Sequence, residues 1–142
     1  MSGRTRQTGR GGIGKLASKK MRILLLDDNA DLLESLQLLL GSSGYEAVTA
    51  GDARQALEIQ RQRPADLLIT DIFMPGTDGL ETIMQFRARW PDLKIVAMSG
   101  GGMIAKRDYL DVAAEIGANA MLRKPVELQD LLDTIIRLTP AQ

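Results

Sequence analysis

The chain of 142 residues contains no cysteine and no histidine, and it has few aromatic residues: one Trp, two Tyr and two Phe. The two absences exclude disulfides, thiolate zinc sites, haem attachment and catalytic pairs of serine or cysteine with histidine. Any metal must therefore be bound by oxygen, which favours a hard cation such as Mg²⁺. Because cysteine and an apolar signal segment are both missing, we expect a cytoplasmic protein.

Long apolar runs are missing as well. The runs at residues 24–26 and 38–40 are far shorter than the ~20 apolar residues that cross a bilayer, so we expect no membrane-spanning segment. The length, with 44% hydrophobic and 25% charged residues, fits one globular domain.

The net charge of zero conceals two different segments. Residues 1–20 contain six basic residues and no acidic one, whereas residues 21–142 contain 12 basic and 18 acidic residues. We therefore expect a basic, disordered N-terminal extension over residues 1–20 and a folded domain over residues 21–142. A glycine-rich stretch at residues 9–14 has no strand before it and does not predict a phosphate loop. A basic arm that contacts nucleic acid or an acidic surface stays an alternative for this segment.

From residue 21 onward, strand-like and helix-like patterns alternate. Short apolar runs predict strands at residues 22–26, 46–50, 67–70, 94–98 and 120–122. Apolar residues at helical spacing predict helices at about residues 32–40, 53–59, 80–87, 106–116 and 128–138. This alternation predicts an α/β fold with a doubly wound, five-stranded parallel sheet, five helices and the flavodoxin-like strand order 2-1-3-4-5.

Local signals mark several helix ends. Asp52 with Gln55, and Asp78 with Glu81, have the spacing of capping boxes and predict the starts of the second and third helices. The fourth helix is expected to end at Gly117. The inward-facing stripe of the third helix is expected to comprise Leu80, Ile83, Met84 and the aliphatic part of Arg87.

Polar residues follow four of the predicted strands: Asp27 and Asp28, Asp71, Ser99, and Lys124. In a parallel sheet these ends meet at one edge, where such folds bind ligands. Three carboxylates close together repel one another and favour a bound cation such as Mg²⁺. Since the chain has no His or Cys, a carboxylate is the remaining nucleophile, and Asp71 at the central strand is the best candidate. Its phosphorylation would give an acyl phosphate, with phosphoryl oxygens neutralised by the cation, the ammonium and the hydroxyl.

Four motifs carry a resemblance to a known family: L-L-D-D at residues 25–28, D-I-F-M-P-G-T-D-G at 71–79, S-G at 99–100 and K-P at 124–125. In this order they resemble the receiver domain of two-component response regulators, over residues 21–138. The resemblance implies that Asp71 is the phosphoacceptor. It further implies that Asp28, Asp71 and the backbone carbonyl of Phe73 bind Mg²⁺ directly, with Asp27 nearby through water.

The same resemblance implies that Ser99 and Lys124 bind the phosphoryl group and that the Lys124–Pro125 peptide bond is cis. The expected phosphoryl donor is a histidine kinase or a histidine phosphotransfer protein. Output is expected through the face formed by the fourth helix, fifth strand and fifth helix, which would bind an unknown downstream protein. We expect a stand-alone receiver with no DNA-binding domain, and no enzyme activity beyond its own phosphorylation and dephosphorylation.

Two positions depart from the family's pattern. Met121 stands where receivers usually carry an aromatic residue that swings inward on activation. Phe73 is bulky where many members have a polar residue, and we hypothesise that it hinders an attacking water and prolongs the phosphorylated state.

Three other functions would use some of the same residues. The main alternative is an unphosphorylated, receiver-like docking module. A flavodoxin-like carrier is disfavoured because Asp27 and Asp28 would repel a phosphate. A haloacid-dehalogenase-like phosphatase would need a second aspartate where Phe73 stands.

Overall fold

The computed structural model describes residues 20–74, 77–100, 103–104 and 107–139. Its centre is a parallel sheet of five strands: β1 (Arg22–Leu26), β2 (Glu46–Ala50), β3 (Leu67–Asp71), β6 (Lys94–Ser99) and β9 (Ala120–Arg123). They lie in the order β2-β1-β3-β6-β9. Counted along the sheet strands alone, this is the order 2-1-3-4-5, so the predicted fold and topology are confirmed.

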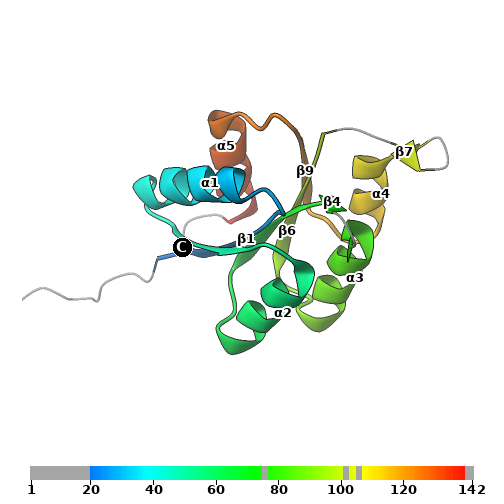
Figure 1. Cartoon of the computed structure of the whole chain (residues 1–142), viewed down its shortest axis with the longest axis horizontal. Coiled ribbons are helices and arrows are strands. Elements are labelled where there is room, and N and C mark those ends of the chain that lie inside the picture. The colour runs from blue at the N-terminus through cyan, green and yellow to red at the C-terminus, as the bar shows by residue number, and fades with distance from the viewer. Residues whose placement is uncertain (1–19, 75–76, 101–102, 105–106, 140–142) are drawn as a thin grey trace, which may run out of the picture.

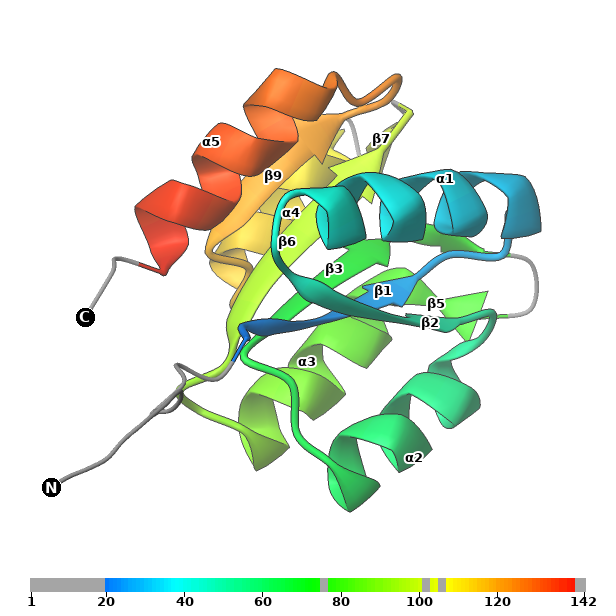
Figure 2. The same cartoon turned by 90° about the vertical axis from the view of Figure 1, so that its left-hand side faces the viewer.

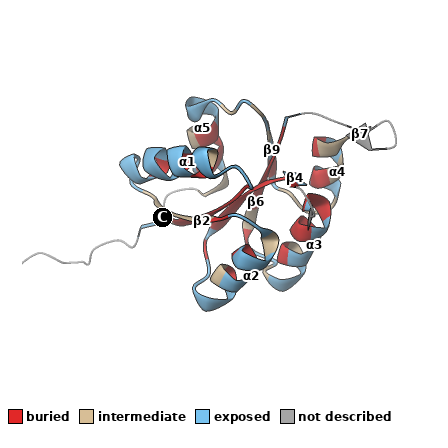
Figure 3. Cartoon of the chain, in the orientation of Figure 1, coloured by how far each residue is buried: buried red, intermediate tan, exposed pale blue. Residues whose placement is uncertain are grey.

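Helices cover both faces of the sheet (Figures 1 and 2). Two of them, α1 (Ala30–Ser42) and α5 (Leu128–Leu138), pack on one face. The other face carries α2 (Ala53–Gln62), α3 (Gly79–Arg89) and α4 (Tyr109–Glu115). Figure 3 shows the result, with buried residues along the strands and exposed residues on the outer sides of the helices.

The alternation of side chains along each strand divides the core into two clusters. Ile23 and Leu25 of β1 face the α1/α5 side, whereas Leu24 and Leu26 face the α2/α3/α4 side. All four are at most 1% exposed. Burial on both faces explains why the central strands are continuous apolar runs rather than alternating patterns.

The predicted helix starts are confirmed at two capping residues. The Asp52 side chain accepts a hydrogen bond from the Gln55 backbone N–H (2.8 Å), and the Gln55 side chain accepts one from the Gly51 backbone N–H. The Asp78 carboxylate accepts from Leu80 and Glu81 at the start of α3. The fourth helical segment is followed by Gly117, whose φ of 125° lies in the left-handed region that favours glycine.

The expected inward stripe of α3 was wrong at one position. Met84 is 48% exposed, whereas Phe86, which the stripe omitted, is fully buried. Adjacent helical residues are turned by about 100°, so Met84 points away when Ile83 faces the sheet. Phe86, three residues after Ile83, returns to the same face.

The start of α4 was also placed too early. The helix begins at Tyr109 rather than near Lys106, which lies outside the described residues. Before it, β7 (Met103–Ile104) and β8 (Arg107–Asp108) form an antiparallel pair. A second small pair joins β4 (Phe73–Met74) to β5 (Thr77–Asp78). Neither pair was predicted, because both are too short to give a periodic pattern.

At the amino-terminal edge of the sheet, Arg87 forms a set of hydrogen bonds that we call the polar clamp. The Arg87 guanidinium donates to the carbonyls of Pro91, Leu93 and Gly117 at 2.7–2.8 Å, and to the side chain of Asn119. These contacts tie α3 to the segments that enter β6 and β9.

Among the helices described, none is long and apolar enough to cross a membrane. Residues 1–19 lie outside the described part of the chain, so the division into an extension and a domain stays a prediction.

Candidate functional site

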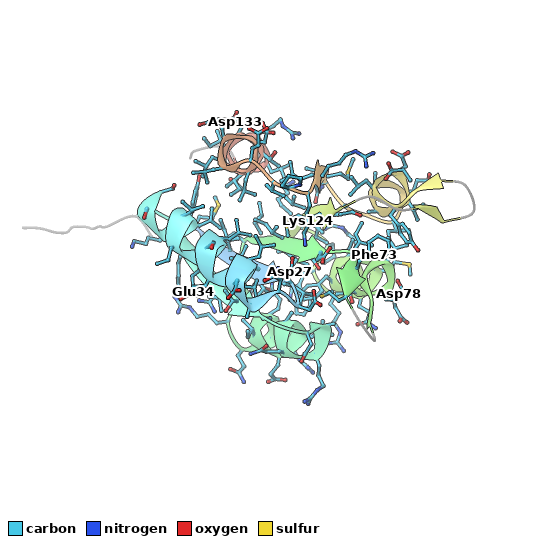
Figure 4. The ribbon with its side chains drawn as sticks, turned by 45° about the horizontal axis from the view of Figure 1, so that its top comes forward. Asp27, Glu34, Phe73, Asp78, Lys124 and Asp133 are labelled. Carbon is cyan, nitrogen blue, oxygen red and sulfur yellow. The ribbon has the colours of Figure 1, made fainter. Side chains whose placement is uncertain are left out.

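Three of the predicted site residues come together at the carboxyl ends of the strands. Figure 4 labels two of them, Asp27 and Lys124. Asp27 directly follows β1, Asp71 ends β3, and Lys124 follows β9. The Lys124 Nζ lies 2.8 Å from an Asp27 carboxylate oxygen and 3.2 Å from an Asp71 carboxylate oxygen. The fold therefore places one ammonium between two carboxylates that are 44 residues apart in the sequence.

Both carboxylates are buried: Asp27 is 1% exposed and Asp71 is 5% exposed. A buried charge is stable only when it is paired and hydrogen-bonded. One oxygen of Asp27 accepts from the backbone N–H of Asn29 (3.0 Å), and one oxygen of Asp71 accepts from the backbone N–H of Phe73 (3.2 Å). Lys124 contacts the other oxygen of each carboxylate. Every one of these four oxygens thus has a polar partner.

Asp28 completes an acidic group at the same edge. One carboxylate oxygen from each of Asp27, Asp28 and Asp71 lies within 4.8 Å of the others. Asp28 is exposed and does not cap α1, because the cap is the side chain of Asn29. An oxygen-only group of three carboxylates, open on the side of Asp28, fits a hard cation such as Mg²⁺, which keeps several of its waters.

The electrostatics of the site favour a further positive charge. Burial and the neighbouring Asp27 raise the pKa of Asp71, and Lys124 lowers it only in part. Burial alone would lower the pKa of Lys124, but its contacts with Asp27 and Asp71 raise it above its ordinary value. Lys124 is therefore an ammonium at neutral pH. Three carboxylates against one ammonium leave an excess of negative charge that a divalent cation would neutralise.

Ser99 is fully buried and ends β6, the strand next to Asp71. Its backbone carbonyl accepts a hydrogen bond from the Lys124 backbone N–H at 2.9 Å, which fixes where Lys124 leaves the sheet. The Lys124–Pro125 peptide bond is cis, as the resemblance implied.

The loop after Asp71 is held close to the sheet. A Cβ at Gly79 would lie 2.1 Å from the carbonyl oxygen of Ile72, so only glycine fits there. The Phe73 side chain is 44% exposed and meets the Tyr109 ring edge-on, with 4.3 Å between the ring centroids. The backbone of Phe73 thus lies beside Asp71 while its side chain reaches the start of α4.

Sequence reasoning missed a second link between the site and α4. Arg123, which precedes Lys124, forms an ion pair with Asp108, whose side chain also caps α4. The ion pair lowers the pKa of Asp108. A single contact between the ends of two short strands, 15 positions apart, leaves no periodic signal, so no pattern in the sequence predicted it. Met121, at the position of the expected aromatic residue, is 38% exposed on β9.

Known proteins are similar to this chain in both sequence and structure. The model of the response regulator receiver domain family matches residues 23–136. Response regulator MprA of Mycobacterium leprae is 38% identical over 116 residues, which cover 81% of this chain and 49% of the relative. MprA of Mycolicibacterium vanbaalenii is 34% identical over 112 residues, with 79% and 47% covered. The chain thus spans about half the length of these relatives.

Solved structures agree with the sequence relatives. The chemotaxis protein CheY4 of Vibrio cholerae has a TM-score of 0.77 at 25% identity, covering 85% of this chain and all of that one. A response regulator receiver domain protein from Clostridium thermocellum has a TM-score of 0.76 at 29% identity, covering 83% and 93%. With the family model matched across most of the described residues, the chain belongs to the response regulator receiver domain family.

Proposed function

We propose that this receiver domain accepts a phosphoryl group on Asp71 and changes its partner binding as a result. The observation that carries the proposal is the buried Asp71 carboxylate, which has the Lys124 ammonium at 3.2 Å and an oxygen of each of Asp27 and Asp28 within 4.8 Å. This arrangement offers an oxygen nucleophile, a fixed cation for a phosphoryl oxygen and ligands for a divalent cation.

In the proposed step, a carboxylate oxygen of Asp71 forms a bond to phosphorus, and the bond from phosphorus to the donor breaks. A histidine kinase or phosphotransfer protein would supply the group as phosphohistidine, whose imidazole nitrogen leaves with the bonding electron pair. Mg²⁺, held by Asp28, Asp71 and the Phe73 carbonyl, would neutralise phosphoryl charge. Lys124 would turn from the Asp71 carboxylate towards a phosphoryl oxygen, and the Ser99 hydroxyl would bind another.

Two contacts support a path from Asp71 to α4. Phe73, two residues after Asp71, touches Tyr109, and Arg123, next to Lys124, pairs with Asp108 at the helix start. A shift of either neighbour of the phosphoryl group would alter contacts that hold α4. We therefore propose output by a population shift at the α4–β9–α5 face. The exposed side chains of Met121 and Leu128, each 38% exposed, are available there to an unknown partner protein.

We further propose that the chain works in the cytoplasm. It would act as a signalling module rather than as an enzyme on a separate substrate. The exposed side chains of the α4–β9–α5 face support output by partner binding.

The direct test is intact mass after incubation with acetyl phosphate and Mg²⁺. We expect the wild type to gain one phosphoryl group, with no gain in Asp71→Asn or when Mg²⁺ is removed by a chelator. Asp92→Asn, at an exposed aspartate between α3 and β6, is the matched control and should behave as the wild type. If the wild type gains nothing from acetyl phosphate or from purified histidine kinases, the chain is an unphosphorylated docking module instead.

A further inference from the structure

We propose that the basic segment of residues 1–20 docks on an acidic face of this same domain, formed by the outer sides of α1 and α5. This inference goes beyond the proposed function and does not rest on it. The face is defined by six exposed carboxylates: Asp28, Asp31, Glu34, Glu127, Asp130 and Asp133.

These carboxylates follow one spacing on both helices. Each row places an acidic residue at every third position. Asp31 and Glu34 lie on α1, and Asp130 and Asp133 lie on α5, so each pair shares one side of its helix. Asp28 and Glu127 lie just before the two helices. Both helices pack on the same side of the sheet and share one core cluster. Figure 4 labels one member of each row, Glu34 on α1 and Asp133 on α5.

The charge of the domain is concentrated on this face. Residues 21–142 contain six more acidic than basic residues, and the two rows contain six carboxylates. From residue 27 to residue 53 the chain has no basic residue at all, and in residues 127–139 Arg137 is the single one. The six basic residues of positions 1–20, with no acidic residue among them, match this charge with the opposite sign.

The segment enters the domain near the C-terminal ends of α1 and α5, whereas the six carboxylates lie towards the starts of these helices. Lys20 is exposed, and Met21 packs against the core cluster that α1 and α5 share. Figures 1 and 2 both show the start of β1 on the same side of the molecule as the C-terminal ends of α1 and α5. Nineteen residues reach at most about 65 Å, and helices of 13 and 11 residues are about 20 and 16 Å long. The segment is therefore long enough to follow either helix to its acidic end.

Exposed apolar residues of the face and apolar residues of the segment would also meet when the segment follows the helices. Near the point of entry the face exposes Leu38 (67%) and Ile136 (61%). Going back from Lys20, the segment first presents Leu16 and Ile13, and its three arginines lie beyond them. The tether keeps the two partners at a high effective concentration, so contacts that are each weak suffice for docking.

The test uses the full chain, which has no cysteine of its own. A nitroxide spin label on a cysteine introduced by Thr8→Cys broadens the amide signals of residues close to the segment. We expect selective broadening along α1 and α5 in low salt, with α2 and α3 unaffected. In ~1 M salt, where charges are screened beyond about 3 Å, the broadening should weaken several-fold.

Two triple variants separate docking on this face from general charge attraction. The face variant is Glu34→Gln, Asp130→Asn and Asp133→Asn, and the control variant is Glu81→Gln, Asp92→Asn and Asp111→Asn. All six positions are exposed, and both variants remove three negative charges. Loss of the broadening in the face variant, and its retention in the control, would support the proposal. Equal broadening of both layers in the wild type, or an equal loss in both variants, would overturn it.

Discussion

Replacing Asp71 with asparagine should stabilise the fold, because the folded state holds this carboxylate at a cost. With an effective dielectric constant of about 20, Lys124 at 3.2 Å attracts the Asp71 carboxylate by about 5 kcal/mol. A carboxylate at 4.8 Å repels it by about 3.5 kcal/mol, and both Asp27 and Asp28 place an oxygen within that distance. Because Asp28 is exposed and screened by water, its repulsion of Asp71 is taken as less than half of this value. Attraction and repulsion then nearly cancel.

The burial of Asp71 decides whether the substitution stabilises or destabilises the fold. Asp71 is 5% exposed, and the cost of removing its charge from water is not offset by neighbours whose contributions cancel. Asparagine keeps the shape and an oxygen that accepts the hydrogen bond from the Phe73 backbone N–H, while Lys124 keeps its contact with Asp27 at 2.8 Å. We expect the free energy of unfolding to rise by about 1–2 kcal/mol at pH 7 without divalent cations, in the lower part of the range for replaced buried ionic groups.

The pH dependence gives an independent check of the cause. The pKa of Asp71 is raised in the folded state, so the folded protein holds this proton more tightly than the unfolded chain does. The charged carboxylate therefore destabilises the wild type above its folded pKa, and this loss is relieved as the pH falls through that value. The advantage of Asp71→Asn should be largest near pH 7 and should shrink as the pH approaches 4.

Urea unfolding followed by circular dichroism measures the effect, and Trp90, which contacts Phe86 in the core, provides a fluorescence signal. A gain of 1 kcal/mol corresponds to a rise in Tm of about 3–5 °C for a domain of this size. Asp92→Asn is the control for loss of a carboxylate elsewhere. Adding Mg²⁺ at about 100 times its Kd should stabilise the wild type by about 2.7 kcal/mol and the variant by much less. A variant less stable than the wild type, or one indistinguishable from Asp92→Asn, would refute the reasoning.

Three further predictions concern α3 and the loop that follows Asp71. Phe86→Ala should lower the free energy of unfolding in urea by about 3–5 kcal/mol, whereas Met84→Ala should lower it by less than about 0.5 kcal/mol. Similar losses in the two variants would contradict the assigned faces of α3. Arg87→Met should lower the free energy of unfolding by about 2–4 kcal/mol, because it leaves the carbonyls of Pro91, Leu93 and Gly117 without a charged donor. An unchanged urea midpoint would show that water replaces the hydrogen bonds of Arg87. Phe73→Asn should speed the decay of the phosphorylated protein, followed by intact mass, whereas equal decay rates would eliminate the hypothesis that Phe73 hinders water.

The sequence predicted the fold well because its signals are local and repeated. Residues 23–26 form a short apolar run, as a strand buried between two helical layers requires. Asp52 and Asp78 mark helix starts by capping chemistry. The site followed from topology rather than from contacts. Once the strands are parallel, the residues after β1, β3 and β9 must meet at one edge, and the structure places Asp27, Asp71 and Lys124 there.

The connection between β6 and α4 could not be predicted for a physical reason. The apolar residues Met103, Ile104, Tyr109 and Leu110 follow neither a clear helical nor a clear strand period, so periodicity alone cannot place the start of the helix. The choice is made by contacts from elsewhere in the chain. Phe73 packs on Tyr109, and Arg123 pairs with Asp108, which caps the helix in place of an earlier start.

These same contacts explain why α4 is the element best placed to report on Asp71. Asp108 caps the first turn of α4 and also pairs with Arg123, which is next to Lys124, so that turn is linked to the site as well as to its own sequence. If phosphorylation moves Lys124, the amides of residues 109–112 should therefore change their hydrogen exchange more than those of α2, whose start is fixed by the local Asp52–Gln55 cap. Equal changes in the two helices would show that the contacts of Phe73 and Arg123 do not carry the signal.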